Sequence, residues 1–140
     1  MKKLLLITSL IGIFFVGTAQ TKNWTASYYH KNELGIALFT QGLFYPELRI
    51  QAENEHFDNT EVSLFIRNDL SVELASDVNL SWGVGASVID GEFGNFRVPL
   101  YIVKKDVLAE NINLMLGLEL NSDFEDKTKL LPKFGISISF

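Results

Sequence analysis

Short runs of alternating apolar and small or polar residues are the clearest pattern along this chain. In LSWGVGASV, residues 80–88, every second position is apolar, and the positions between them hold only serine and glycine. Segments 96–103, 112–121 and 132–140 alternate in the same way. Because successive side chains of a β-strand point to opposite faces, this period of two residues predicts strands over all four segments.

The preceding part of the chain carries a noisier version of the pattern. It predicts strands over 33–40, 45–53 and 61–67, a weaker one over 23–30, and at 70–74 either a further strand or part of a long turn. Clusters of Asn, Asp and Gly separate the runs, as in hairpin connections. The total is about eight strands, with several near the length of about 9–11 residues that a tilted membrane-crossing strand needs. We therefore expect an all-β fold, an antiparallel up-and-down barrel of about eight strands.

Residues 1–19 have the three parts of a secretory signal peptide. Lys2 and Lys3 precede an apolar run over 4–16, and the small residues 17–19 follow it. The run is shorter than the about 20 residues of a membrane-spanning helix. We expect cleavage between Ala19 and Gln20, which leaves one barrel domain over residues 20–140.

Charge and cysteine content narrow the possible functions of this domain. Loss of Lys2 and Lys3 with the leader changes the formal net charge from −5 to −7. Nucleic-acid binding is not expected, because it needs a basic surface. The chain has no cysteine, so neither disulfides nor thiolate metal sites hold the fold.

Alternation alone does not tell which face of the strands meets water. The apolar face points inward in a soluble barrel and towards lipid in a membrane barrel. Here the other face is mostly glycine and serine, which suit the crowded interior of an eight-stranded barrel better than a solvated surface. Larger polar residues of both signs share this face and could pair across the interior. The predicted polar lumen residues are Glu47, Arg49, Arg67, Arg97 and Glu119.

Aromatic residues fit the membrane arrangement, in which they form girdles at the two interfaces. We expect five of them towards strand ends: Trp24, Tyr28, Trp82, Phe96 and Phe140.

The alternative is a soluble periplasmic β-barrel or sandwich that binds a small apolar ligand or a partner protein. Its interior would be formed by Leu114, Leu116, Leu118, Trp82 and Val84. Pro99 favours this alternative, because a mid-strand proline removes a ladder hydrogen bond and implies a bulge or an edge strand.

The last nine residues, PKFGISISF, resemble the C-terminal assembly signal of bacterial outer-membrane β-barrels. Phe134, Ile136, Ile138 and Phe140 match its alternating apolar positions. Behind an export signal, the chain is similar to the small eight-stranded barrel family. The resemblance implies a place in the cell outer membrane, both termini in the periplasm, and membrane lipids and the barrel-assembly machinery as partners.

Candidates for catalysis are few. His30 and His56 lie near predicted loops, and Ser27 or Ser63 would have to supply a nucleophile beside an orienting carboxylate. No local motif supports that arrangement, so we expect no enzyme, and a lipid-directed activity through either histidine is the minor alternative. No cofactor or metal site is expected. A barrel of this size should be too full for solutes. The sequence therefore favours a structural or surface-interaction role rather than transport.

Overall fold

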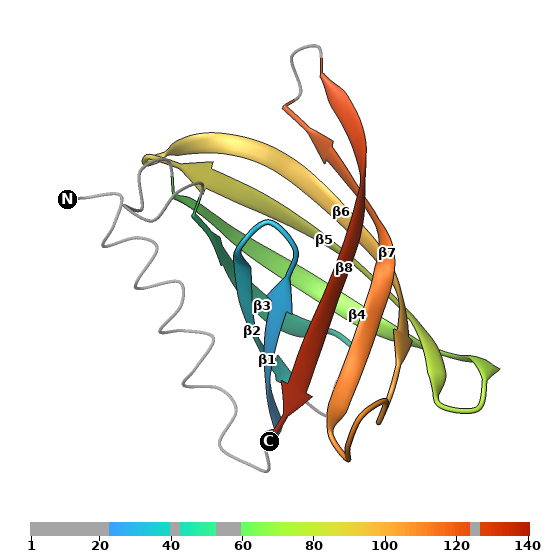
Figure 1. Ribbon diagram of the computed structural model, residues 1–140. Helices are drawn as coiled ribbons and strands as arrows, with labels where there is room; N and C mark the ends of the chain where they lie inside the picture. Colours follow the sequence, from blue (N-terminus) through green and yellow to red (C-terminus); the bar gives the residue numbers. More distant parts are fainter. Residues whose placement is uncertain (1–22, 40–42, 53–59, 124–126) are drawn as a thin grey trace.

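The chain folds into a closed eight-stranded β-barrel in the computed structural model, which describes residues 23–39, 43–52, 60–123 and 127–140 (Figure 1). The predicted leader, with its Ala19–Gln20 cleavage site, lies outside these residues. Each strand pairs antiparallel with its neighbour in the chain. The strands are β1 (Asn23–Tyr29), β2 (Glu33–Phe39), β3 (Tyr45–Gln51), β4 (Glu61–Ala75), β5 (Val78–Ile89), β6 (Glu92–Lys104), β7 (Ile112–Ser122) and β8 (Thr128–Ser139).

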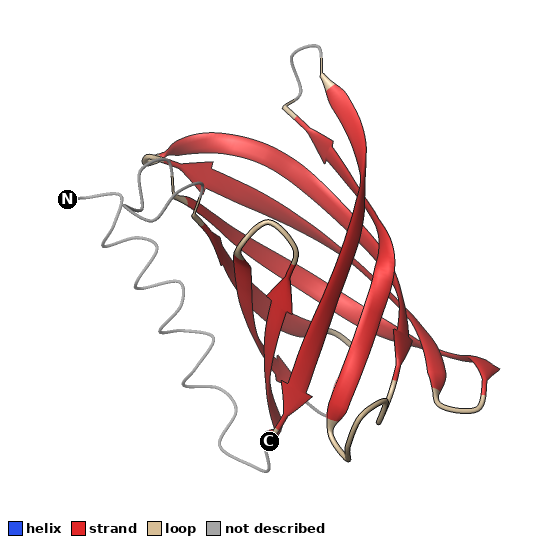
Figure 2. Cartoon of the chain, viewed as in Figure 1, coloured by secondary structure: helices blue, strands red, loops and turns tan. Residues whose placement is uncertain are grey.

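The predicted all-β architecture and strand count are confirmed, with two corrections to the boundaries. The segments 61–67 and 70–74 belong to one strand, β4, whose pairing with β5 continues through register shifts between Leu70 and Ala75. The final strand begins at Thr128 rather than at Pro132. Its first part pairs only with β7, which gives the β7–β8 hairpin its projection beyond β1 (Figure 2).

Tight turns join several strands. Asp90 and Gly91 connect β5 to β6, and both have positive φ, at 50° and 85°. A two-residue hairpin of the type I′ geometry requires positive φ at both positions, which explains the Asp-Gly pair. Residues 30–32 join β1 to β2, again with positive φ at Lys31 and Asn32.

Within the described residues, no helix is long and apolar enough to cross a membrane.

The first and last strands close the barrel. β1 pairs with β8 from Thr25 opposite Ser139 to Tyr29 opposite Gly135. Trp24 and Phe140 extend the ladder, because each backbone N–H donates to the other residue's carbonyl, at 2.9 and 2.8 Å. The strand that ends at Phe140 is therefore tied into the sheet, and this seam leaves no open edge between the two strands.

Pro99 lies inside the closed wall, on β6, and not on an edge strand. It pairs with Glu119 of β7, while the β5–β6 ladder has a gap between the pairs Trp82–Leu100 and Gly85–Arg97. The register is the same on both sides of this gap, and the register shift of β5–β6 falls instead between Ala86 and Val88. The expectation of an edge strand or a bulge at Pro99 is therefore wrong. The flanking pairs hold the register where proline donates no hydrogen bond.

The barrel is polar inside and apolar outside. Gly83 and Ser137 are buried in the interior, and so are Ser81, Ser87 and Lys133 on the same strand faces, whereas Leu116 and Ile138 are 53% and 50% exposed. The alternative interior is not the observed one: Leu114, Leu118 and Val84 are also exposed, and Trp82 is partly exposed.

The aromatic side chains follow the expected girdles only in part. Trp24, Tyr28 and Phe140 lie at or next to strand ends, as predicted. Trp82 and Phe96 lie well inside β5 and β6, because these strands are longer than the sequence pattern indicated. Trp82 makes an edge-on contact with Phe44, whose ring centroid is 6.3 Å away.

Candidate functional site

The middle of the barrel is filled by a buried network of charged and aromatic side chains. The structure places all five predicted lumen residues there, with 0–4% of each exposed: Glu47, Arg49, Arg67, Arg97 and Glu119. Strand alternation accounts for this, because each of them occupies an inward position of its strand, and all but Arg67 lie between two apolar neighbours.

Arg49 is at the centre of the network. Its guanidinium lies between the rings of Tyr29 and Phe65, with the central carbon 4.1 and 4.2 Å from their centroids. It also pairs with Glu47 at 2.9 Å and with Glu119 at 3.0 Å. Cation–π contacts strengthen when they are shielded from water, so the fully buried Arg49 is held by charge and by ring faces together.

Arg97 organises the part of the lumen towards the β5–β6 turn. Its Nε donates to Glu119 at 2.8 Å, Nη2 pairs with Glu33 at 2.9 Å, and Nη1 donates to the Ser63 hydroxyl at 2.6 Å. Lys133 forms a further ion pair with Glu33. These contacts join residues from β2, β4, β6, β7 and β8, and so they cross the barrel from wall to wall.

Arg67 lies on the opposite side of the network, towards the end of the barrel where β1 begins. Nη1 donates to Glu47 at 2.9 Å and to the Tyr29 hydroxyl at 3.2 Å, and Nη2 donates to Ser81 at 2.6 Å. The Tyr29 hydroxyl in turn donates to Glu47 at 2.6 Å. Buried charges are tolerated when they are paired and hydrogen-bonded in this way.

Sequence reasoning missed several members of the network, among them a buried ion pair. Glu33 and Lys133 are buried and paired with each other, although neither was assigned to the lumen. The signal was present in the alternation: Glu33 shares a face with Gly35 and Ala37, and Lys133 shares one with Gly135. With Glu61, which lies 3.4 Å from Arg97, four carboxylates face four cations among the described residues.

Glycines opposite the largest lumen side chains make room for them. Five inward glycines each pair across the sheet with a large residue: Gly35 with Arg49, Gly83 with Arg67, Gly85 with Phe65, Gly117 with Tyr101, and Gly135 with Tyr29. At Gly135 an added Cβ would lie 2.7 Å from the Tyr29 ring, closer than real Cβ atoms approach. The glycines of the alternating strands thus fit the lumen filling piece by piece.

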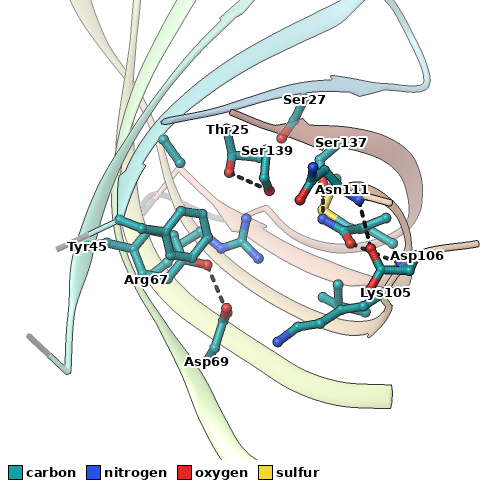
Figure 3. A pocket seen from close by; sticks show the side chains of 15 residues that line it. Thr25, Ser27, Tyr45, Arg67, Asp69, Lys105, Asp106, Asn111, Ser137 and Ser139 are labelled. Carbon is teal, nitrogen blue, oxygen red and sulfur yellow. Dashed lines mark hydrogen bonds between the residues drawn. The ribbon is translucent and has the colours of Figure 1, made fainter. Parts of the chain in front are cut away.

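Beyond Arg67, towards the end where β1 begins and β8 finishes, the lumen opens into a cavity of about 310 Å³ (Figure 3). Hydroxyl groups of Thr25, Ser27, Ser137 and Ser139 line one side of it, and Tyr45 lies on the other. This cavity was not anticipated from the sequence.

His30, the histidine candidate among the described residues, does not join this interior. His30 lies in the β1–β2 turn, where its ring stacks on Phe134 at 4.6 Å and its Nδ1 accepts a hydrogen bond from the Phe134 N–H. Burial lowers the pKa of His30, and the positive charges of Lys133 and Lys31 act in the same direction. Ser63 is engaged with Arg97, and His56 lies outside the described residues. Among the described residues, no group of three or more His, Asp or Glu side chains is placed to hold a metal ion.

Comparisons with known proteins add no relative: no protein-family model matches the sequence, and no curated protein matches it.

Proposed function

We propose that this protein is a small outer-membrane β-barrel with a filled lumen, which has a structural or surface-interaction role rather than a transport role. The observation that carries the proposal is the polarity of the wall, with buried charges inside and exposed apolar side chains outside. Membrane barrels have this arrangement, because the outer face meets lipid and the interior is polar.

The apolar outer face runs through every strand pair. Adjacent strands place apolar residues opposite one another around the whole circumference: Tyr28–Leu34, Leu34–Ile50, Leu48–Leu64, Ile66–Val84, Trp82–Leu100, Leu100–Leu118, Leu116–Phe134 and Ile136–Tyr28. Many of these side chains are highly exposed, for example Leu34 at 61% and Phe134 at 55%. Monomeric soluble proteins rarely expose continuous apolar patches of more than a few hundred Å².

Closure of the sheet supports the same proposal. An unpaired strand edge in lipid would leave backbone N–H and C=O groups without partners, at a cost of several kcal/mol each. The β1–β8 seam pairs these groups up to Trp24 and Phe140. An exported barrel with this seam needs an insertion route, and the barrel-assembly machinery is the partner we propose. Phe134, Ile136, Ile138 and Phe140 all lie on the exposed outer face, where such a factor could read them before closure.

The filled lumen argues against transport. Arg49, Glu47 and Glu119 have no exposed surface, and Arg97 is 1% exposed, so the middle of the barrel leaves no open path past them. We expect the purified protein to give no steady conductance in planar bilayers. Stable channels for small ions in the unmodified protein would contradict the filled lumen.

Localisation is tested by fractionation and by a matched pair of arginine substitutions. We expect the protein in the outer-membrane fraction and insoluble without detergent. Leu116→Arg, in the apolar outer face, should destabilise the membrane-folded state by about 2–4 kcal/mol. Leu108→Arg is the control, because Leu108 is 77% exposed in the β6–β7 turn, away from the paired apolar rows. A protein that stays soluble without detergent, with equal tolerance of both variants, would refute the proposal.

A further inference from the structure

The cavity next to Arg67 has features of a binding site for a small molecule. Its volume of about 310 Å³ is at the lower end of the range of small-molecule pockets. Its lining comes from seven of the eight strands and the β6–β7 turn, so the closed barrel itself holds the walls in place. The ion-pair network closes it on the inner side.

Hydrogen-bonding groups of the cavity have capacity to spare. A hydroxyl can donate one hydrogen bond and accept two, yet the Thr25 and Ser139 hydroxyls bond mainly to one another, at 3.1 Å. Ser137 accepts a hydrogen bond from the Asn113 side chain at 3.4 Å. On the inner side, Arg67 is 4% exposed, and its Nη groups are bonded to Tyr29, Glu47 and Ser81. Donors and acceptors are thus both available to a ligand.

The charges of the cavity are balanced. Arg67 is paired with Glu47, and Asp69 accepts a hydrogen bond from the Tyr45 hydroxyl at 2.8 Å. Lys105 and Asp106 are adjacent in the β6–β7 turn and have opposite signs. An anion or a cation would therefore meet an unfavourable neighbour as well as a favourable one, so the lining favours a neutral molecule.

One wall of the cavity is apolar. The rings of Phe39 and Tyr45 pack together with their centroids 4.2 Å apart, and Ala37, Val103 and Met115 also line the space. A sugar ring presents hydroxyl groups at its edge and C–H groups on its faces. The aromatic wall matches the C–H faces of such a ring, and the hydroxyl and amide groups of the cavity match its edge hydroxyls. Figure 3 shows the hydroxyl groups that line the cavity.

We propose that this cavity binds a neutral polyhydroxylated solute of monosaccharide size. Thr25, Ser137, Ser139 and Asn113 bond its hydroxyls, and the Phe39–Tyr45 wall covers its C–H face. The site needs only the closed barrel, so it stands or fails separately from the membrane location.

The test is an NMR titration of isotope-labelled protein with glucose, in an amine-oxide detergent whose head group is not a sugar. We expect saturable shifts of the Thr25, Asn113 and Ser139 amides, with a dissociation constant on the order of millimolar. The Ser87 amide, which lies outside the cavity lining, should not move. Acetate and methylammonium at equal ionic strength serve as charged probes and should bind about tenfold more weakly.

Two variants locate the binding. Ser137→Leu fills the cavity and should weaken glucose binding by at least about tenfold. Thr25→Val removes one hydroxyl at nearly constant volume and provides the test if the larger residue prevents folding. The proposal is overturned if glucose gives no saturable shifts, if a charged probe binds as well, or if neither variant weakens binding.

Discussion

The two halves of the lumen differ in how they are filled, although seven of the strands contribute to both. In the middle, Arg49 and its partners are buried and cross the lumen, and inward glycines make room for them. Towards the start of β1, the inward positions hold Thr25, Ser27, Ser137 and Ser139, and a cavity remains.

This difference shows that one alternating pattern can give either an interior filled by side chains or a cavity. The outward face is apolar at both levels, so the wall is continuous. What changes is the size of the inward residues and whether a long side chain reaches across from the facing strand. Substitutions that change charge or volume should therefore destabilise the barrel when they lie in the middle of the lumen, and should be tolerated in the cavity half.

Removal of the central charge should have the largest effect. Arg49→Met keeps the length of the side chain but leaves Glu47 and Glu119 with fewer buried partners, which should cost about 3–5 kcal/mol. Urea unfolding of the detergent-folded protein, followed by tryptophan fluorescence, measures this cost. Lys104→Met is the control, because its pair with Asp77 is long, at 3.8 Å, and exposed, and should be worth less than about 1 kcal/mol. Equal losses of unfolding free energy for the two variants would show that the stability of the filled middle does not depend on its charges.

Added side-chain volume should have the second-largest effect on stability, and the effect should differ between the two halves of the lumen. Gly135 and Ser137 are two residues apart on the inner face of β8. Gly135→Val would press on the Tyr29 ring and should cost about 1–3 kcal/mol through overpacking. Ser137→Val places the same side chain at the cavity and should cost about 1 kcal/mol or less, since it loses only a long hydrogen bond. The same unfolding assay compares the two variants. A larger loss of stability for Ser137→Val than for Gly135→Val would contradict the assignment of a filled middle and a cavity.

Loss of one cavity hydroxyl should have the smallest effect on stability. Thr25→Val breaks the bond to Ser139 and should cost about 0.5–1 kcal/mol, because the cavity leaves space for water to replace the lost partner. A cost as large as that of Arg49→Met would mean that this end is as tightly coupled as the middle. Thermal unfolding in detergent is sensitive enough to rank these variants.

Much of the wall could be predicted from the sequence. Alternation at 80–88, 112–121 and 132–140 identified strands and separated the two faces, because the side-chain period of a strand is two. Glycine and serine on one face indicated a crowded interior, and Arg49, Arg67 and Arg97 were assigned there together with Glu47 and Glu119. Boundaries were less accurate where alternation fades, as at 70–74 and 128–131.

Which charge meets which depends on tertiary structure. Arg49 and Glu119 are 70 positions apart, and Arg97 and Glu33 are 64 apart. Only the strand register and the closing β1–β8 seam bring such residues together. Alternation by itself leaves open which face is inside, because it is the same for both orientations. The glycines, serines and charged residues of one face indicated the orientation.

The sequence by itself determined the period of the strands, their approximate number and the composition of each face, since these depend on local backbone geometry. The tertiary structure alone decided the pairing of Glu33 with Lys133, the fit of each glycine to a large neighbour, the tolerance of Pro99 and the cavity beside Arg67. These features arise from contacts across the barrel, and such contacts exist only once eight strands have closed in one register.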